Sequence, residues 1–359
     1  IIKETVLQTA PVWTTYRSRE YPELRLIDKG NGGKADSLNA GINIARGEYI
    51  CSIDADSLLE QDSLLRLMSV LLDSDTETAA VGGNVLPVNS CRVRHGQIQS
   101  YHLPRNPLAL FQNLEYLRAF IGGRMGWALT GSLLIISGAF GVFRRDRIIR
   151  IGGYLTGEGR YRRETVGEDM ELVVRLRRNL FDRKIKHRVQ YQHTASCWTE
   201  APEKLKGLLS QRDRWQRGLI EILIYHRKML AAVRYRAVGL WALPYFYLFE
   251  LFGPIWSSFG YFILILSIIA GLLPASSIWL LLAVSVGLGI AVSAATLLLV
   301  DRSVIQYSPR DVAISLFGVI AENLGYQQLI SFHRAFSTLR FVFRDAGWQK
   351  IERKGFRQG

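Results

Sequence analysis

The feature that most constrains the fold is a long, almost uncharged segment in the last third of the chain. Between residues 237 and 300 the only charged side chain is Glu250. A helix that crosses a bilayer needs about 20 apolar residues, so this segment has room for at least two crossings. We therefore expect a globular part before residue 237 and a membrane-associated part after it.

Two stretches of this segment suit a bilayer crossing, residues 253–273 and 276–300, with a tight loop around Pro274 between them. The preceding residues 237–252 are shorter and contain a proline and Glu250. They fit a further span, a re-entrant segment or a helix lying in the interface. A soluble chain with a very apolar pair of core helices is the alternative to the membrane interpretation.

A later apolar stretch, residues 311–330, carries Glu322 and Asn323 in its middle. Such side chains are costly in a helix that faces lipid, so the stretch fits either a functional span or an interfacial helix.

The distribution of basic residues predicts the orientation in the membrane. The tail after Ile330 is basic, and nine basic residues precede the apolar segment: Lys204, Lys206, Arg212, Arg214, Arg217, Arg227, Lys228, Arg234 and Arg236. The positive-inside rule then places both ends in the cytoplasm, which requires two or four crossings. Topology and anionic membrane lipid explain much of the net charge of +14, and no nucleic acid partner is needed.

The division of the chain follows from these patterns. We expect a cytoplasmic catalytic domain over residues 1–236, transmembrane or interfacial helices over 237–335, and a basic cytoplasmic tail over 336–359. The three cysteines, Cys51, Cys91 and Cys197, are widely spaced and odd in number, so the sequence supports neither a disulfide framework nor a zinc ribbon. A reducing compartment fits best, and the expected location is the plasma (inner) membrane.

The globular part has the pattern of an α/β fold. Short apolar runs alternate with helical stretches from residue 24 to about residue 180, which favours a mostly parallel sheet. The expected strands cover residues 24–27, 48–53, 79–85 and 133–143, and the expected helices cover 34–45, 61–72 and 170–178. Ligands of such folds gather at the carboxyl ends of the strands.

Two carboxylates follow one of these strands. Asp54 and Asp56 stand at i and i+2, so their side chains share a face of an extended chain. Hard oxygen ligands suit Mg²⁺ or Mn²⁺ bridging a diphosphate. By itself, the pair fits a turn or a helix cap equally well.

A glycine-rich turn leads into the helix that begins near Lys34. Ala35 follows the lysine and the first glycine of a P-loop is missing, so a nucleoside triphosphatase is disfavoured. The turn can still receive a phosphate beside Lys34, or it is simply a flexible turn with an exposed lysine.

Two further clusters carry candidate chemistry. Glu168 and Asp169 open a helix, where acids complement the helix dipole, and a carboxylate there can also act as a general base. Gln211, Arg214 and Trp215 share one helical face, which suits a diphosphate and a sugar ring but also an interfacial Trp-Arg pair.

These motifs occur in a fixed order that resembles the membrane-bound family 2 glycosyltransferases, among them the synthases of cellulose, hyaluronan, chitin and poly-N-acetylglucosamine. The resemblance covers residues 24–215 and agrees with the membrane segments that follow. It implies a GT-A domain, a Rossmann-like mixed sheet, followed by a transmembrane helical bundle.

The resemblance also implies roles for the donor-side residues. Lys34 would contact the nucleotide or its diphosphate, Asp54 and Asp56 would bind the nucleotide-sugar and Mg²⁺ or Mn²⁺, and Arg214 would contact the diphosphate. Asp169 would be the base that deprotonates the acceptor hydroxyl.

On the acceptor side, the resemblance implies a loop under the acceptor sugar and a motif that accompanies processive synthesis. The loop comprises Ser137, Gly138, Ala139, Phe140 and Gly141, and Gln211 and Trp215 belong to the processive motif. The implied reaction is a single inverting displacement on a UDP-sugar that extends a β-linked polysaccharide.

Two positions depart from the family pattern. No strand with a uridine-binding acid is recognisable before residue 24, so we expect an N-terminally truncated domain that binds UDP poorly. Gly167 replaces the threonine of the acidic motif and leaves the expected base in place.

Two other functions stay open: transfer of one sugar to a lipid carrier, or a non-catalytic membrane subunit. A transporter is disfavoured by the large α/β domain. The expected partners are the UDP-sugar, a saccharide or lipid-linked acceptor and membrane lipid, with an export or accessory subunit as a further candidate.

Overall fold

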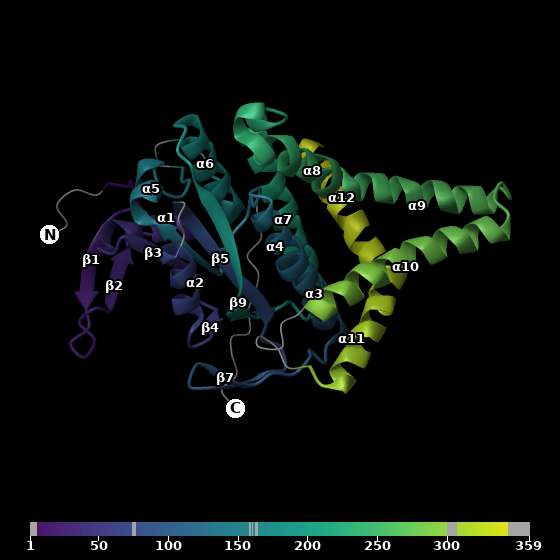
Figure 1. Cartoon of the computed structure of the whole chain (residues 1–359), viewed down its shortest axis with the longest axis horizontal. Helices are drawn as coiled ribbons and strands as arrows, with labels where there is room; N and C mark the ends of the chain where they lie inside the picture. The colour runs from purple at the N-terminus through teal and green to yellow at the C-terminus, as the bar shows by residue number, and fades with distance from the viewer. Residues whose placement is uncertain are drawn as a thin grey trace.

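The computed structural model describes residues 6–73, 77–157, 159, 161, 164–299 and 307–343. An α/β domain lies at one end, and a long helical hairpin projects from the other (Figure 1). The strands are β1 (Val12–Arg17), β2 (Arg25–Lys29), β3 (Tyr49–Ile53), β4 (Leu58–Leu59), β5 (Thr78–Pro87), β6 (Arg92–Arg94), β7 (Gln97–Ser100), β8 (Phe140–Arg144) and β9 (Arg188–Thr199).

The helices of the first part are α1 (Gly33–Ile44), α2 (Ser63–Leu72), α3 (Pro107–Leu117), η1 (Arg118–Arg124), α4 (Met125–Leu129), α5 (Arg145–Arg150), α6 (Glu168–Asp182) and α7 (Leu205–Tyr225). Those that follow are η2 (Arg227–Met229), η3 (Val233–Tyr235), η4 (Val238–Ala242), α8 (Leu243–Tyr245), η5 (Phe246–Leu251), α9 (Gly253–Ile269), α10 (Ala275–Leu299), α11 (Pro309–Ala321), η6 (Glu322–Tyr326) and α12 (Gln327–Phe343).

The central sheet is mixed, as the family resemblance implied, whereas the mostly parallel sheet expected from the hydrophobic pattern is wrong. Its order is β3-β8-β5-β9-β4. Among the described strands of this sheet only β5 and β9 pair in parallel, because β8 runs antiparallel to both β3 and β5, and β4 runs antiparallel to β9. The strands β1 and β2 form a separate antiparallel hairpin.

The expected strand over residues 133–143 begins only at Phe140. Leu133, Leu134 and Ile136 are buried but lie outside any strand. A run of apolar residues indicates that a segment is buried but does not show that it is a strand. Here the buried residues before Phe140 form an irregular segment that leads into β8. The other expected strands and helices of the α/β part are present, with ends shifted by a few residues.

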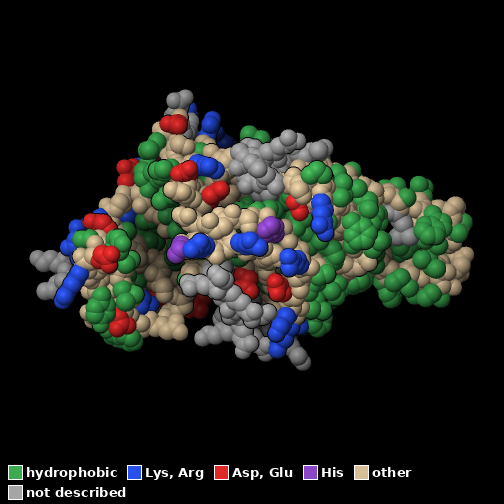
Figure 2. All heavy atoms as spheres, turned by 90° about the horizontal axis from the view of Figure 1, so that it is seen from below, with side chains coloured by type: hydrophobic (Ala, Val, Ile, Leu, Met, Phe, Trp, Pro, Cys, Tyr) green, Lys and Arg blue, Asp and Glu red, His purple; other side chains and the backbone are tan. Residues whose placement is uncertain are grey.

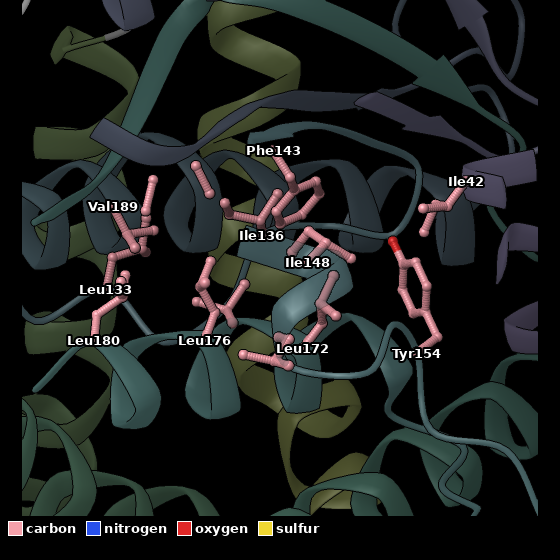
Figure 3. Packing of buried hydrophobic residues seen from close by; sticks show 14 of the residues in the cluster. Ile42, Leu133, Ile136, Phe143, Ile148, Tyr154, Leu172, Leu176, Leu180 and Val189 are labelled. Carbon is pink, nitrogen blue, oxygen red and sulfur yellow. The ribbon is translucent and has the colours of Figure 1, made fainter. Parts of the chain in front are cut away.

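Helix α6 covers one face of the sheet and builds the main core. Its residues Leu172, Leu176 and Leu180 are buried at helical spacing. They pack with residues such as Ile136 and Phe143 (Figure 3). This packing fixes the first turn of α6, where Glu168 and Asp169 stand.

A buried ion pair lies on the same helix. Arg175 donates from Nε to the Glu171 carboxylate at 2.7 Å and from Nη2 to the carbonyl oxygen of Gly153 at 2.6 Å. His226 Nε2 lies 3.4 Å from Glu171 Oε1, the same oxygen that accepts from Arg175 Nε. The guanidinium therefore ties α6 to the loop that follows α5.

Two helical segments in the described residues are long and apolar enough to cross a bilayer, Val238–Ile269 and Ala275–Leu297. They form most of the projecting hairpin in Figure 1, where α9 and α10 extend away from the sheet. Hydrophobic side chains dominate that projection, whereas the charged side chains gather on the body (Figure 2). Large apolar side chains such as Trp256 and Trp279 are exposed there, as expected for a surface that faces lipid.

Residues 237–252 contribute η4, α8 and η5 to this first segment, and α9 continues it into the hairpin, which gives 32 residues in all. Glu250 bonds to Arg334 of α12, with Nη2 3.1 Å from Oε2. The carboxylate therefore has a cationic partner.

Residues 311–330 do not form one continuous helix. The backbone breaks at Leu324 and Gly325, between α11 and α12. Glu322 is buried and receives hydrogen bonds from both terminal nitrogens of Arg118 in η1. Glu322, in the middle of this segment, is thus paired with Arg118 of the preceding domain.

Helix α12 continues to Phe343, past residue 336 where the tail was expected to begin. It packs along α7, and Arg334 donates from Nε to Gln216 Oε1 at 2.8 Å. Residues 344–359 of the expected tail lie outside the described residues.

Candidate active site

Lys34 stands in the first turn of α1, beside the end of β3. Its ammonium nitrogen lies 2.6 Å from Asp54 Oδ1 and 3.1 Å from Glu168 Oε1. Burial lowers the pKa of Lys34, but Glu168, Asp54 and Asp169 outweigh it and raise that pKa above its usual value. The lysine is therefore cationic throughout the physiological range.

Asp169 is held at the start of α6 by two backbone donors. The N–H of Met170 donates to Oδ1 at 2.7 Å, and the N–H of Gly138 donates to Oδ2 at 3.3 Å. Burial and the charge of Asp169 raise the pKa of the neighbouring Glu168, and Lys34 opposes that rise. The two adjacent acids thus have different partners: Glu168 faces the lysine and Asp169 faces the loop before β8.

The side chains of Lys34 and Asp169 both lie next to Gly138. A Cβ atom at this position would lie 2.8 Å from Lys34 Nζ and 3.5 Å from Asp169 Cβ. A side chain at this position would collide with the ammonium, so only glycine lets Lys34 lie against the loop beside Asp169.

The acids that follow β3 suit a divalent metal. Asp54 and Asp56 are both half-buried, and Asp54 contacts Lys34. Among the described residues no group of three or more His, Cys, Asp or Glu gathers in a metal-binding arrangement. Two carboxylates still fit Mg²⁺ or Mn²⁺, because such ions take one or two protein ligands and complete their shell with substrate phosphates and water.

The loop before β8 divides into an accessible and a buried half. Ser137 and Gly138 are half-buried, and Ser137 Oγ accepts the Ala139 N–H at 3.3 Å. The side chains of Ala139 and Phe140 are buried, and Phe140 packs so closely on Gly83 that a Cβ there would lie 2.3 Å from its ring. Only the first half of the loop can present side chains to a ligand.

Helix α7 carries the expected Gln211, Arg214 and Trp215. Trp215 is 42% exposed, so part of its side chain is accessible to a ligand. Arg212 lies over the ring at 4.5 Å and donates to both oxygens of Glu115 at 2.6 and 2.7 Å. Arg214 is half-buried on the helix.

The unusual Gly167 has a structural reason. A Cβ atom added to Gly218 of α7 would lie 2.9 Å from the Cα atom of Gly167, so the two backbones are in contact. No other residue type fits at either position without displacement. The turn that carries Asp169 is therefore seated directly on the helix that carries Trp215.

Sequence reasoning missed a group of residues on α3 and η1. The Tyr116 ring lies 6.5 Å from Trp215, and Phe120 lies 5.8 Å from Tyr116. Arg124 covers the Phe120 ring at 3.7 Å. These residues belong to no motif, and only their spacing of four along a helix indicated a shared face.

A shallow surface hollow of about 620 Å³ lies elsewhere. It is lined by Arg46, Gly47, Glu48, Arg145 and Asp146, among others. Glu48 precedes β3, whereas Asp54 follows it, so the hollow lies at the opposite end of the strand. It is separate from the site built around Lys34 and Asp169.

Comparison with known proteins gives the family. The model of glycosyltransferase-like family 2 matches residues 14–218, more than half of the chain. The chain belongs to this family. The matched residues include Lys34, Asp54, Asp169 and the first two thirds of α7, so the family 2 domain contains the site described above.

Several curated relatives of this family 2 chain are poly-beta-1,6-N-acetyl-D-glucosamine synthases. The chain is 27% identical over 210 residues to the synthase of Staphylococcus aureus (strain COL), covering 58% of this chain and 44% of that protein. It is 26% identical over 231 residues to the synthase of Staphylococcus epidermidis, covering 64% and 49%. The alignments thus span less than half of these relatives.

A solved structure with a similar arrangement is the mannosyltransferase PcManGT from Pyrobaculum calidifontis, in complex with GDP-Man and Mn²⁺. The TM-score is 0.46 at 14% identity, covering 87% of this chain and 67% of that one. The mixed sheet agrees with the GT-A fold of family 2 domains, and the two apolar helical segments that follow are compatible with a transmembrane region.

Proposed function

We propose that the chain transfers a sugar from a UDP-sugar to the growing end of a β-linked polysaccharide, with inversion at the anomeric carbon. The observation that carries this proposal is the meeting of Lys34 and Asp169 at Gly138. A donor-side cation and an acceptor-side carboxylate lie next to one glycine, and a single displacement requires such groups to be held close together. The relatives that make poly-N-acetylglucosamine favour UDP-N-acetylglucosamine as the donor.

In this proposal Asp169 accepts the proton of the attacking hydroxyl. The backbone donors on its two oxygens hold the carboxylate in one orientation, and a lone pair on each oxygen remains available. The acceptor oxygen bonds to the anomeric carbon as the bond to UDP breaks on the opposite face. Lys34 neutralises the negative charge that develops on the leaving diphosphate.

Asp54 and Asp56 would hold Mg²⁺ or Mn²⁺. When bound, the ion would supply further positive charge to the diphosphate. Lys34 already neutralises Asp54 at 2.6 Å, so a diphosphate competes with Asp54 for the lysine and the aspartate becomes available to the metal.

The acceptor would lie along α7, with a sugar ring stacked on the exposed part of Trp215. Gln211 points its side chain toward Tyr116 on the same side. The contact between Gly167 and Gly218 joins the helix that carries Trp215 to the turn that carries the proposed base. In this proposal the connection keeps the end of one retained polymer next to Asp169 during repeated transfer.

We place the α/β domain in the cytoplasm, with the hairpin of α9 and α10 in the membrane. The charged body and the apolar projection support this arrangement (Figure 2). The basic residues that precede the hairpin agree with the positive-inside rule.

The proposal is tested with membranes that carry the full-length protein, incubated with Mg²⁺ or Mn²⁺ and a panel of UDP-sugars. We expect metal-dependent UDP release from one donor together with a long product. Asp56→Ala should raise the metal concentration for half-maximal rate about tenfold to hundredfold, since a charge-assisted ligand is lost. A product of one sugar would indicate transfer to a lipid carrier, and no UDP release from any donor would overturn the transferase proposal.

A second prediction concerns the glycine contact. Gly218→Val should lower kcat about a hundredfold, because the new side chain pushes the turn of Asp169 off α7. Gly207→Val on the same helix is the control, since a Cβ at that position makes only an ordinary contact, 3.5 Å from Pro202. Equal rates for the two variants would show that the glycine contact does not position the base.

A further inference from the structure

Three arginines line the surface hollow at the start of β3. Arg46 lies in the turn between α1 and β3, and Arg145 and Arg150 lie at the two ends of α5. Two segments that are far apart in the chain thus meet around one space. Its volume of about 620 Å³ falls within the range of sites that hold small molecules.

The two acidic residues of the hollow are paired with arginines that do not line it. Glu48 accepts a hydrogen bond from Arg144 Nη2 at 3.1 Å. Asp146 has one oxygen 3.6 Å from Arg144 Nε and the other 3.5 Å from Arg147 Nε. The negative charge of both acids is therefore balanced from outside the hollow.

The three lining arginines, in contrast, form no ion pair with any acidic residue that the structure describes. Arg145 donates from Nε to the carbonyl oxygen of Ile42 at 3.1 Å, which holds its side chain against the end of α1. Arg46 and Arg150 are exposed. Because arginine stays protonated in proteins, the hollow carries three positive charges that its own acids do not neutralise.

The hollow is distant from both the membrane segments and the candidate active site. In Figure 1, α5 lies at the end of the body opposite the hairpin of α9 and α10. The five-residue strand β3 separates Glu48 from Asp54. At about 3.3 Å per residue, the strand keeps these two acids about 20 Å apart. Neither a lipid headgroup beside the hairpin nor a diphosphate held at Asp54 would therefore reach these arginines.

We propose that the hollow binds a small soluble molecule that carries phosphate groups. A guanidinium donates paired N–H bonds in a planar fork, which matches the oxygen atoms of a phosphate. Cations on two separate segments suit a ligand with more than one negative charge, because such a ligand can contact both segments at once. This site is a second one on the chain, and the inference does not rest on the proposed sugar transfer.

The test is a calorimetric titration of the full-length protein, in phosphatidylcholine nanodiscs, with inorganic pyrophosphate. EDTA is present, so that no divalent ion brings the pyrophosphate to the candidate active site. We expect saturable binding to the wild type. Arg46→Gln and Arg150→Gln should each raise the Kd about tenfold to hundredfold, as for a lost charge-assisted hydrogen bond.

Arg94→Gln is the matched control, since it removes an exposed arginine of β6 from outside the hollow and should leave the Kd unchanged. An excess of UDP should not displace the pyrophosphate. The inference is overturned if the wild type shows no saturable binding, or if Arg46→Gln and Arg150→Gln bind as the wild type does. An equal rise in Kd for Arg94→Gln would also overturn it, because binding would then follow net charge alone, and displacement by UDP would place the anion at the candidate active site instead.

Discussion

Replacing Asp169 by asparagine is expected to lower kcat for sugar transfer about 10²- to 10⁴-fold, the usual contribution of a positioned general base. The amide keeps one carbonyl oxygen, which can accept from only one of the two backbone donors, Met170 or Gly138, and it cannot accept the proton of the hydroxyl. The affinity for UDP, measured by calorimetry on the full-length protein, should stay within about twofold, because Lys34 and the two acids after β3 are untouched.

The exposed Asp62 offers a matched control, and Asp62→Asn should retain the wild-type rate. If Asp169→Asn keeps near-normal turnover, its assignment as the base is withdrawn. If UDP affinity falls together with kcat, Asp169 acts on the donor side instead.

The largest effect on stability is expected for Arg175→Met. The substitution leaves Glu171, which is 1% exposed, without its main cationic partner, and it frees the carbonyl oxygen of Gly153. Removal of one member of a buried ion pair costs about 3–5 kcal/mol. Thermal unfolding in detergent should show a clear fall in Tm, or no folded protein at all.

Arg178→Met on the same helix is the control, because Arg178 faces Asp182 at 3.9 Å with both side chains partly exposed. That pair should contribute about 0–1 kcal/mol, so its loss should barely move Tm. Equal shifts for the two variants would show that the buried pair is not a main support of α6.

The same ion pair gives the wild type a pH dependence. Burial raises the pKa of Glu171, but Arg175 and His226 outweigh it, so the net pKa lies below the ordinary value of 4.5. The stability that this carboxylate contributes is therefore present above pH 4.5 and is lost as the pH falls through the lowered pKa. The fall in Tm below pH 4.5 should be smaller in Arg175→Met.

The sequence singled out residues that the fold brings together, although it did not predict the sheet that carries them. Lys34, Asp54 and Asp169 lie at element ends, where local patterns are strongest; Lys34 contacts Asp54, and Lys34 and Asp169 both lie next to Gly138. The direction of β8 was not predictable, because an apolar run such as residues 133–139 reports burial alone. Strand direction depends on partners far away in the chain.

The contacts between helices were equally hidden. Arg212 stood in a basic stretch that suggested a membrane flank, yet it is buried against Glu115, which is 97 residues away. Gly218 carried no motif, and its role appears only when Gly167 is placed against it. Such pairings depend on tertiary packing, which a single sequence does not encode locally.

The guanidinium of Arg334 has a consequence for how membrane and active site communicate. It bonds to Gln216 on α7 and, through Nη2, to Glu250 at the approach to α9. One side chain thus connects the helix that would hold the polymer to a segment whose depth the bilayer sets. Thermodynamic linkage is reciprocal. If a change in bilayer thickness alters the affinity for the polymer, a bound polymer must shift the balance between thinner and thicker bilayers by the same free energy.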